Sequence, residues 1–221
     1  LCLGLVLLVA KYAPGTAVPS LDCRRQCGTV EIPYPFGIDP GCSLAEGFDL
    51  SCKVQDGVQK PFRGAFEVLD ISLTQGTARV LNYILGYCYN TSTGSMEYFG
   101  RYAGFNEGDP SSPYRFSDVQ NKFTVIGCNA LVLIYDYDAT GYQGLGVATC
   151  RNLSDLVDGS CSGMGCSQTA IPKRMFYYDT TFLKGVNTSE IWEFNPCSYA
   201  VLMEAATFRF NTTYINTNKF N

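Results

Sequence analysis

The chain contains no histidine among its 221 residues, and this absence excludes several kinds of chemistry. Without an imidazole there is no Ser-His-Asp triad, no Cys-His dyad, no histidine-ligated zinc and no imidazole acid-base step. The H-R-D motif of the protein kinase catalytic loop also needs a histidine. The sequence therefore predicts no complete kinase domain of that type.

Charge is also scarce, because Asp, Glu, Lys and Arg make up 16% of the chain and the net charge is −4. Globular domains usually contain about 25% charged residues. The acidic balance argues against a nucleic-acid binder held by bulk charge. The 15 Tyr and 14 Phe argue against disorder. The length suffices for one or two domains with a buried core.

Long apolar runs are missing as well. No segment holds 18 uninterrupted apolar residues, so no transmembrane helix is predicted. Residues 2–10 (CLGLVLLVA) have the length of a signal-peptide core, and small residues follow at Gly15 and Ala17, with Val18-Pro19-Ser20 as a second cleavage position. Neither Met nor a basic segment precedes this run. We predict a signal peptide with a truncated start at residues 1–20, the alternative being a buried strand.

Eleven cysteines are present, and Cys2 lies in the apolar run. The other ten form an even set that permits five disulfides, whose pairing the sequence does not reveal. Zinc is the alternative, but no C-x2-C pair exists, so we predict disulfides in an oxidising compartment. The predicted disulfide cysteines are Cys23, Cys27, Cys42, Cys52, Cys88, Cys128, Cys150, Cys161, Cys166 and Cys197.

N-x-S/T sequons support secretion. They predict N-glycosylation at exposed loop or edge positions of an extracellular or cell-surface protein. The predicted acceptors are Asn90, Asn152, Asn187 and Asn211.

Short runs rich in β-branched and aromatic residues alternate with turn signals among the 22 Gly and 10 Pro. They predict a mainly β, disulfide-rich fold with short helical turns. In 66–73 the apolar residues alternate, whereas 131–135 is apolar throughout, as in a strand covered on both faces. A short helix is predicted at 153–157, capped by Asn152 or Ser154. The predicted strands are 29–32, 47–52, 66–73, 77–85, 96–102, 123–127, 131–137 and 198–203.

A segment rich in Pro, Gly and Ser at 104–118 is the best candidate for a domain boundary. We therefore predict two small β modules, at 21–103 and 119–221, joined by a linker loop at 104–118.

Residues 23–52 (CRRQCGTVEIPYPFGIDPGCSLAEGFDLSC) are the most informative stretch. Pro33 and Pro35 favour extended backbone in the residues before them, and four cysteines would staple a unit with little core of its own. The segment resembles the galacturonan-binding domain of plant wall-associated receptor kinases. The matching positions are Cys23-x3-Cys27-Gly28, Ile32-Pro33-Tyr34-Pro35-Phe36-Gly37-Ile38, Cys42, Phe48 and Cys52.

Residues 144–174 resemble the C-terminal module of the same ectodomains, with two departures. Gly146 and Ser167 stand where relatives commonly carry cysteines. We hypothesise that these two positions form one disulfide in relatives; a relative's disulfide map that pairs them elsewhere would refute this. The family's transmembrane helix and kinase domain are not in this chain, so the resemblance implies an ectodomain fragment or a soluble form.

The resemblance implies binding of pectin, an acidic cell-wall polysaccharide, without catalysis. Cationic groups would bind galacturonate carboxylates and aromatic faces would pack on the sugars. Because the net charge opposes a polyanion, binding would rely on a local basic patch or on bridging Ca²⁺. The predicted ligand-binding residues are Arg24, Arg25, Tyr34, Phe36, Lys53, Lys60 and Arg63.

Each of these residues also has a purely structural interpretation. Tyr34 and Phe36 could pack in a core, and adjacent arginines often form a solvated face. A protein- or peptide-recognition ectodomain in cell-surface signalling is the alternative function. An enzyme is disfavoured, because no carboxylate pair stands out and Gly144-Leu145-Gly146 and Gly163-Met164-Gly165 are lone G-x-G elements, which we interpret as turns.

Overall fold

The fold is known from a computed structural model that describes residues 2–9, 22–100, 112–136 and 141–217. Strands dominate this part of the chain, and its only helical elements are the 3₁₀ turns η1 (Leu153–Asp155) and η2 (Thr212–Asn216). The prediction of a mainly β fold is confirmed. No helix within the described residues is long and apolar enough to cross a membrane.

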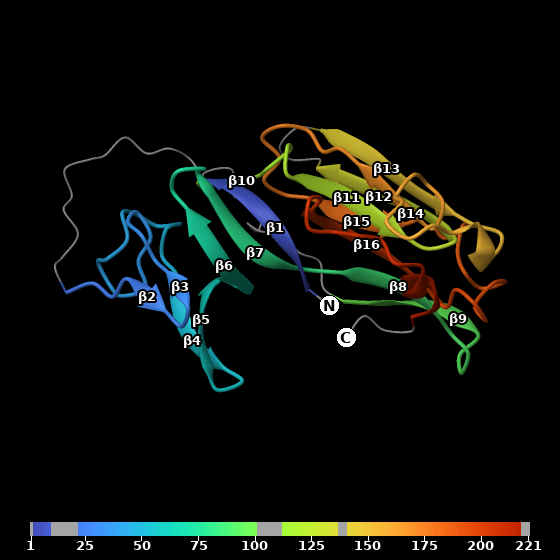
Figure 1. The fold of residues 1–221 in the computed structure, drawn as a ribbon, viewed down its shortest axis with the longest axis horizontal. Helices are drawn as coiled ribbons and strands as arrows, with labels where there is room; N and C mark the ends of the chain where they lie inside the picture. Colours follow the sequence, from blue (N-terminus) through green and yellow to red (C-terminus); the bar gives the residue numbers. More distant parts are fainter. Residues whose placement is uncertain (1, 10–21, 101–111, 137–140, 218–221) are drawn as a thin grey trace.

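A six-stranded sheet with the order β10-β1-β7-β6-β5-β4 occupies one end of the elongated molecule (Figure 1). The short hairpin of β2 and β3 lies beside it and contacts β5 and β6. The strands are β1 (Cys2–Val9), β2 (Gln26–Cys27), β3 (Val30–Glu31), β4 (Ser51–Gln55), β5 (Val58–Arg63), β6 (Phe66–Ser72), β7 (Thr77–Tyr83) and β10 (Tyr114–Phe116).

Two further sheets form the other end of the molecule. A five-stranded sheet has the order β14-β11-β16-β8-β9, and a three-stranded sheet has the order β13-β12-β15. The strands are β8 (Leu85–Asn90), β9 (Ser95–Phe99), β11 (Asn121–Ile126), β12 (Asn129–Asp136), β13 (Tyr142–Thr149), β14 (Cys166–Thr169), β15 (Asp179–Phe182) and β16 (Cys197–Glu204).

Strand pairing crosses the predicted boundary at 104–118. β8 and β9 precede that boundary in the chain, yet β8 pairs antiparallel with β16 near the C-terminal end. Within the predicted linker, Tyr114–Phe116 form β10 and pair with β1, and residues 104–111 lie outside the described residues. Sequences on both sides of the boundary thus share one sheet.

The apolar run near the start forms a strand in the structure, which is the alternative to a signal peptide. β1 pairs with β7 on one side and β10 on the other, and Leu5, Val6 and Leu7 are buried. The buried amide of Asn121 accepts a hydrogen bond from Val6 N at 2.9 Å and donates one to Val6 O at 2.6 Å. The signal peptide stays a prediction, and N-terminal sequencing of the secreted protein tests it.

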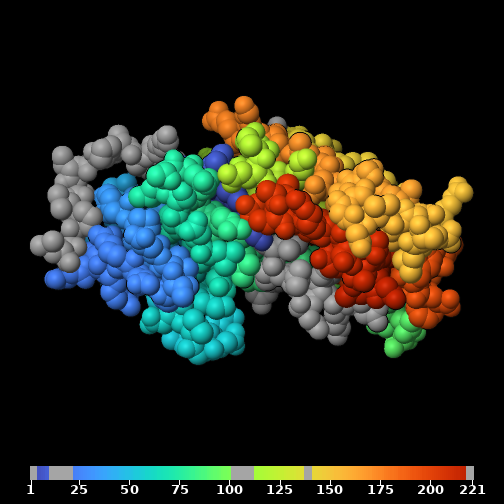
Figure 2. Space-filling model, in the orientation of Figure 1, coloured from blue at the N-terminus to red at the C-terminus, as the bar shows by residue number. Residues whose placement is uncertain are grey.

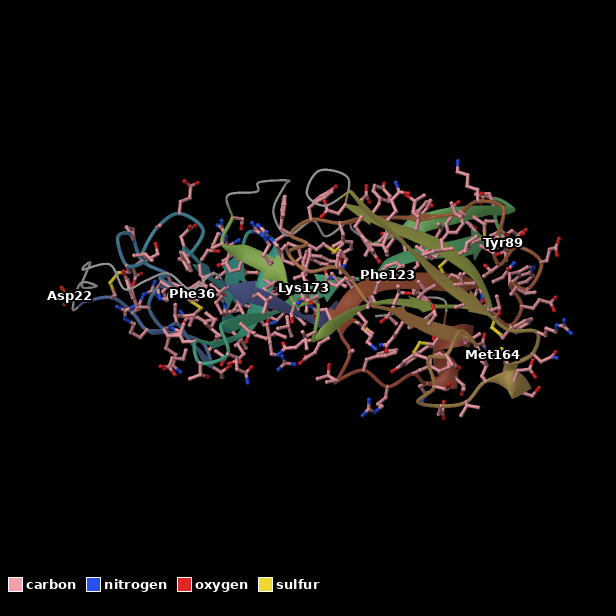
Figure 3. The ribbon with its side chains drawn as sticks, turned by 90° about the horizontal axis from the view of Figure 1, so that it is seen from above. Asp22, Phe36, Tyr89, Phe123, Met164 and Lys173 are labelled. Atoms are coloured by element: carbon pink, nitrogen blue, oxygen red, sulfur yellow. A yellow bond between two sulfur atoms is a disulfide. The ribbon has the colours of Figure 1, made fainter. Side chains whose placement is uncertain are left out.

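Five disulfides join all ten cysteines of the predicted set (Figure 3). Two staple the N-terminal ribbon, one joins β8 to β16, and two lie in the C-terminal region. The pairs are Cys23–Cys42, Cys27–Cys52, Cys88–Cys197, Cys128–Cys150 and Cys161–Cys166. The disulfide prediction is confirmed, with a pairing that the sequence did not reveal.

The two G-x-G elements differ in structure. Gly163 and Gly165 have φ of +107° and +70° before β14, as expected of a turn. The interpretation of Gly144 and Gly146 as a turn was wrong, because both lie within β13. A Cβ at Gly146 would clash with the side chain of Val125, so glycine permits this strand to pack closely on the core.

Gly146 and Ser167 lie on β13 and β14, two strands that contact each other. Leu145 O accepts a hydrogen bond from Thr169 Oγ1, and Thr149 O accepts one from Gly165 N, so these contacts bracket both positions. Ser167 Oγ is buried and has no hydrogen-bond partner within the described residues. A Cβ at Gly146 would meet the side chains of Val125 and Phe123, and the hypothesis of a disulfide in relatives stays a prediction.

The predicted helix at 153–157 is the shorter η1, and Asn152 is its N-cap. Asn152 and Asn211 are exposed, as the sequons require, whereas Asn90 and Asn187 are half-buried. The Asn90 side chain donates to Glu97 at 3.0 Å, and that of Asn187 donates to Lys184 O at 2.9 Å. N-glycosylation of the four sites stays a prediction.

Candidate functional site

The ribbon of residues 23–52 is held as a stapled unit against the six-stranded sheet. Its two disulfides close loops of 19 and 25 residues. Ile32, Phe36 and Phe48 are at most 1% exposed and belong to the main hydrophobic core. The unit therefore has an apolar interior that fixes the polar residues around it.

The structure places Phe36, one of the predicted ligand-binding residues, in the core, which is its structural interpretation. Its side chain is 1% exposed, and its ring meets that of Phe48 edge-on, with centroids 5.4 Å apart (Figure 3). A ligand in solvent cannot touch it. Tyr34 differs, because it is half-buried and its hydroxyl has no hydrogen-bond partner within the described residues. Tyr34 stays a candidate.

Three of the five predicted cations form ion pairs with carboxylates of this chain. The ion pairs are Arg24–Asp39 at 2.6 Å, Lys60–Glu67 at 3.0 Å and Arg63–Asp49 at 3.2 Å. Each pair would have to open, or share its charge, before the cation could bind a ligand carboxylate. We therefore expect these three residues to contribute less to anion binding than unpaired cations.

The Arg24–Asp39 pair has the strongest geometry of the three. Arg24 donates to Asp39 from Nε, Nη2 and its backbone N. These hydrogen bonds lower the pKa of the Asp39 carboxyl below its ordinary value and raise that of Arg24. Because the folded pKa of Asp39 is depressed, the pair stabilises the fold above the ordinary carboxyl pKa and loses this effect as pH falls.

Arg25 is one of the two predicted cations outside these ion pairs. Its Nη1 is buried and has no hydrogen-bond partner within the described residues. Its side chain lines an open hollow of about 560 Å³ together with Gln26, Thr29 and Glu31 from the β2–β3 hairpin. We call this the Arg25 hollow. An unsatisfied guanidinium nitrogen at its wall is suited to bind an anion or a hydroxyl oxygen.

Lys53 is the other. It is exposed on β4, and its Nζ lies 5.3 Å from the centroid of the Phe62 ring. Lys53, Phe62 and Tyr83 line an open hollow of about 350 Å³, which we call the Lys53 hollow. A cation beside two aromatic side chains suits an acidic sugar, whose carboxylate meets the ammonium and whose C–H face meets a ring.

Phe62 and Tyr83 were not among the ligand-binding residues predicted from the sequence. They lie on β5 and β7, 21 positions apart, and only sheet pairing brings them to one hollow. The only sequence signal for these two residues was that they follow the motif at residues 23–52 and lie in runs that contain aromatic residues.

The structure gives no support to bridging Ca²⁺. Within the described residues, no group of three or more Asp, Glu, Cys or His side chains could hold a metal ion. Asp136 is buried at the end of β12, and Asp109 and Asp138 lie outside the described residues.

Comparison with known proteins identifies the stapled unit. Residues 23–82 match the family described as wall-associated receptor kinase galacturonan-binding. Over 94% of its length the chain is 30% identical to wall-associated receptor kinase 2 and 31% identical to wall-associated receptor kinase 3 of Arabidopsis thaliana. No solved structure matches the chain.

The chain spans 28% of the length of each of these two relatives. The matched residues include the stapled ribbon, the Arg25 hollow and the lining of the Lys53 hollow except Tyr83. The chain is thus a wall-associated receptor kinase ectodomain, belonging to that family by the match at residues 23–82 and by its similarity to these relatives.

Proposed function

We propose that this ectodomain binds galacturonan of the plant cell wall outside the cell, without catalysis, through the Arg25 and Lys53 hollows. The supporting observation is that the two predicted cations outside the ion pairs of the matched domain both line hollows. A polygalacturonate chain repeats one carboxylate per sugar, so two separated cations can bind the same polymer.

The proposal that the protein binds without catalysis rests on the small number of carboxylates that line these hollows. Glycoside hydrolysis requires two carboxyl groups on either side of the scissile bond. Among its described lining residues, the Arg25 hollow has Glu31 as its single carboxylate, and the Lys53 hollow has none.

Substitution of the two cations tests this function. We expect Arg25→Gln and Lys53→Gln each to weaken binding of de-esterified oligogalacturonides about tenfold, since a hydrogen bond to a charged group contributes about 1.5 kcal/mol. Isothermal titration calorimetry with oligomers of graded length measures the dissociation constants. Added salt should weaken binding further by screening the charges.

Arg24→Gln is the matched control, because it removes one positive charge from the same ribbon where Asp39 already neutralises it. We expect little change in affinity for this variant. Saturable binding that is equally insensitive to all three substitutions would keep the ligand but reject the two hollows. No binding by the folded, unsubstituted protein would reject galacturonan and favour a protein- or peptide-recognition ectodomain.

A further inference from the structure

A third hollow, of about 390 Å³, lies outside the matched domain and gathers positive charge. Its positively charged lining residues are Arg115 on β10 and Lys173 and Arg174 in the segment between β14 and β15. Asp118 is the one carboxylate among its described lining residues. We call it the Arg115 hollow. The yellow-green surface near residue 115 lies beside the orange surface near residue 173 in Figure 2, and Lys173 lies near β10 in Figure 3. None of its residues was predicted from the sequence.

The charge of this hollow contrasts with that of the whole protein. The chain has a net charge of −4, yet the described lining residues of this hollow include three cations and one carboxylate. Lys173 and Arg174 are exposed, and their side chains make no ion pair within the described residues. A local excess of positive charge in a concave surface concentrates anions even when the net charge is negative.

Arg115 is held in a fixed orientation. Its Nη1 donates to Ser112 O at 2.7 Å and to Tyr114 O at 2.6 Å, and its guanidinium lies 5.0 Å from the centroid of the Phe176 ring. These contacts restrain a side chain that otherwise has many rotamers. A guanidinium oriented in advance loses less entropy when a planar carboxylate binds to it.

Arg174 has a left-handed backbone, with φ of +69°. For a residue other than glycine this conformation is strained and is often found at functional sites. A glycine would adopt the same backbone without this strain, so Arg174→Gly removes the side chain and leaves the local backbone possible.

We propose that the Arg115 hollow is a further carboxylate-binding site for the acidic polysaccharide, formed by residues outside the matched domain. This inference rests on the proposed function. Arg115, Lys173 and Arg174 bind uronate carboxylates, and the apolar side chain of Pro113 in the same hollow packs against sugar C–H groups. A polymer that reaches both this hollow and the matched domain gains affinity through its effective concentration.

The experiment uses the combined substitutions Lys173→Gln and Arg174→Gly in the full chain. Arg174→Gly removes the charge and the backbone strain together, so a loss of binding cannot be attributed to unfolding if the melting temperature does not fall. We expect the unsubstituted protein to bind one more short oligogalacturonide per chain than the variant. Long oligomers should bind the variant at least tenfold more weakly, as measured by calorimetry.

Lys122→Gln is the matched control, because Lys122 is exposed on β11 and does not line the hollow. It removes one charge and should leave the stoichiometry unchanged. An isotherm of the Lys173→Gln/Arg174→Gly protein identical to that of the unsubstituted protein would overturn the further site. If Arg25→Gln and Lys53→Gln still weaken binding in that case, the proposed function stands. If the unsubstituted protein binds no oligogalacturonide, both proposals fail.

Discussion

Removal of the Cys88–Cys197 disulfide is expected to lower the free energy of unfolding by about 4.7 kcal/mol, according to the chain-entropy treatment of a loop of this size. The two cysteines are 109 residues apart in sequence and lie directly opposite each other in β8 and β16. Without the covalent link the unfolded chain regains the entropy that this long loop had lost. Urea denaturation of Cys88→Ala/Cys197→Ala, followed by tyrosine fluorescence, measures the change.

The Cys161–Cys166 disulfide provides the comparison. These cysteines are 5 residues apart, and the same treatment gives a loss of about 2 kcal/mol for Cys161→Ala/Cys166→Ala. We therefore expect the first variant to be clearly less stable than the second. Equal losses would show that local packing around the sulfurs, and not loop length, controls the stability that these bonds provide.

Phe36→Ala is expected to destabilise the protein by about 3–5 kcal/mol, the usual cost of removing a buried phenylalanine ring. The ring is 1% exposed and lies in the core cluster with Ile32 and Phe48. Its loss leaves a cavity that the two flanking disulfides prevent from collapsing fully. Thermal and urea unfolding of the variant measure the effect.

Phe36→Leu separates packing from ligand contact. Leucine keeps an apolar side chain in the core, so we expect a smaller loss of stability than in Phe36→Ala and an unchanged affinity for oligogalacturonides at a temperature where the variant is folded. A Phe36→Leu protein that is stable but binds at least tenfold more weakly would contradict the assignment of Phe36 to the core.

Strands with clear periodicity could be predicted from the sequence. The alternation in 66–73 and the β-branched runs near 77–85 and 123–127 correspond to β6, β7 and β11. In the apolar run at 131–135, Val132 and Ile134 are fully buried, while Leu131 and Leu133 are half-buried. The sequence shows apolar character, but the degree of burial depends on what covers each face.

Other strands could not be predicted because their local signals point elsewhere. Pro61 lies within β5, where proline normally argues against a strand. Glycines in β13 suggest a turn, yet Gly146 is required by the close approach of the Val125 side chain. β1 has the composition of a signal-peptide core, and only its pairing with β7 and β10 shows it as part of a sheet.

The candidate site could likewise be predicted only in part from the sequence. Cysteines, prolines and aromatic residues in a specific order were sufficient to predict the stapled domain and its family. They were insufficient to distinguish Arg24 from Arg25, because the acid that pairs with Arg24 is 15 residues away in sequence. Distant residues placed by folding determine which cations remain available for a ligand.

The disulfide pairing also determines the order in which the protein can mature during synthesis. The chain emerges from its N-terminus, so Cys23–Cys42 and Cys27–Cys52 can close once about 50 residues have appeared. Cys88 cannot form its native disulfide until Cys197 has been synthesised, and Cys128 is synthesised between the two. The stapled unit can therefore be oxidised early, whereas the sheet that contains β8 and β16 depends on a thiol kept reduced, or on an isomerase that corrects its early partners.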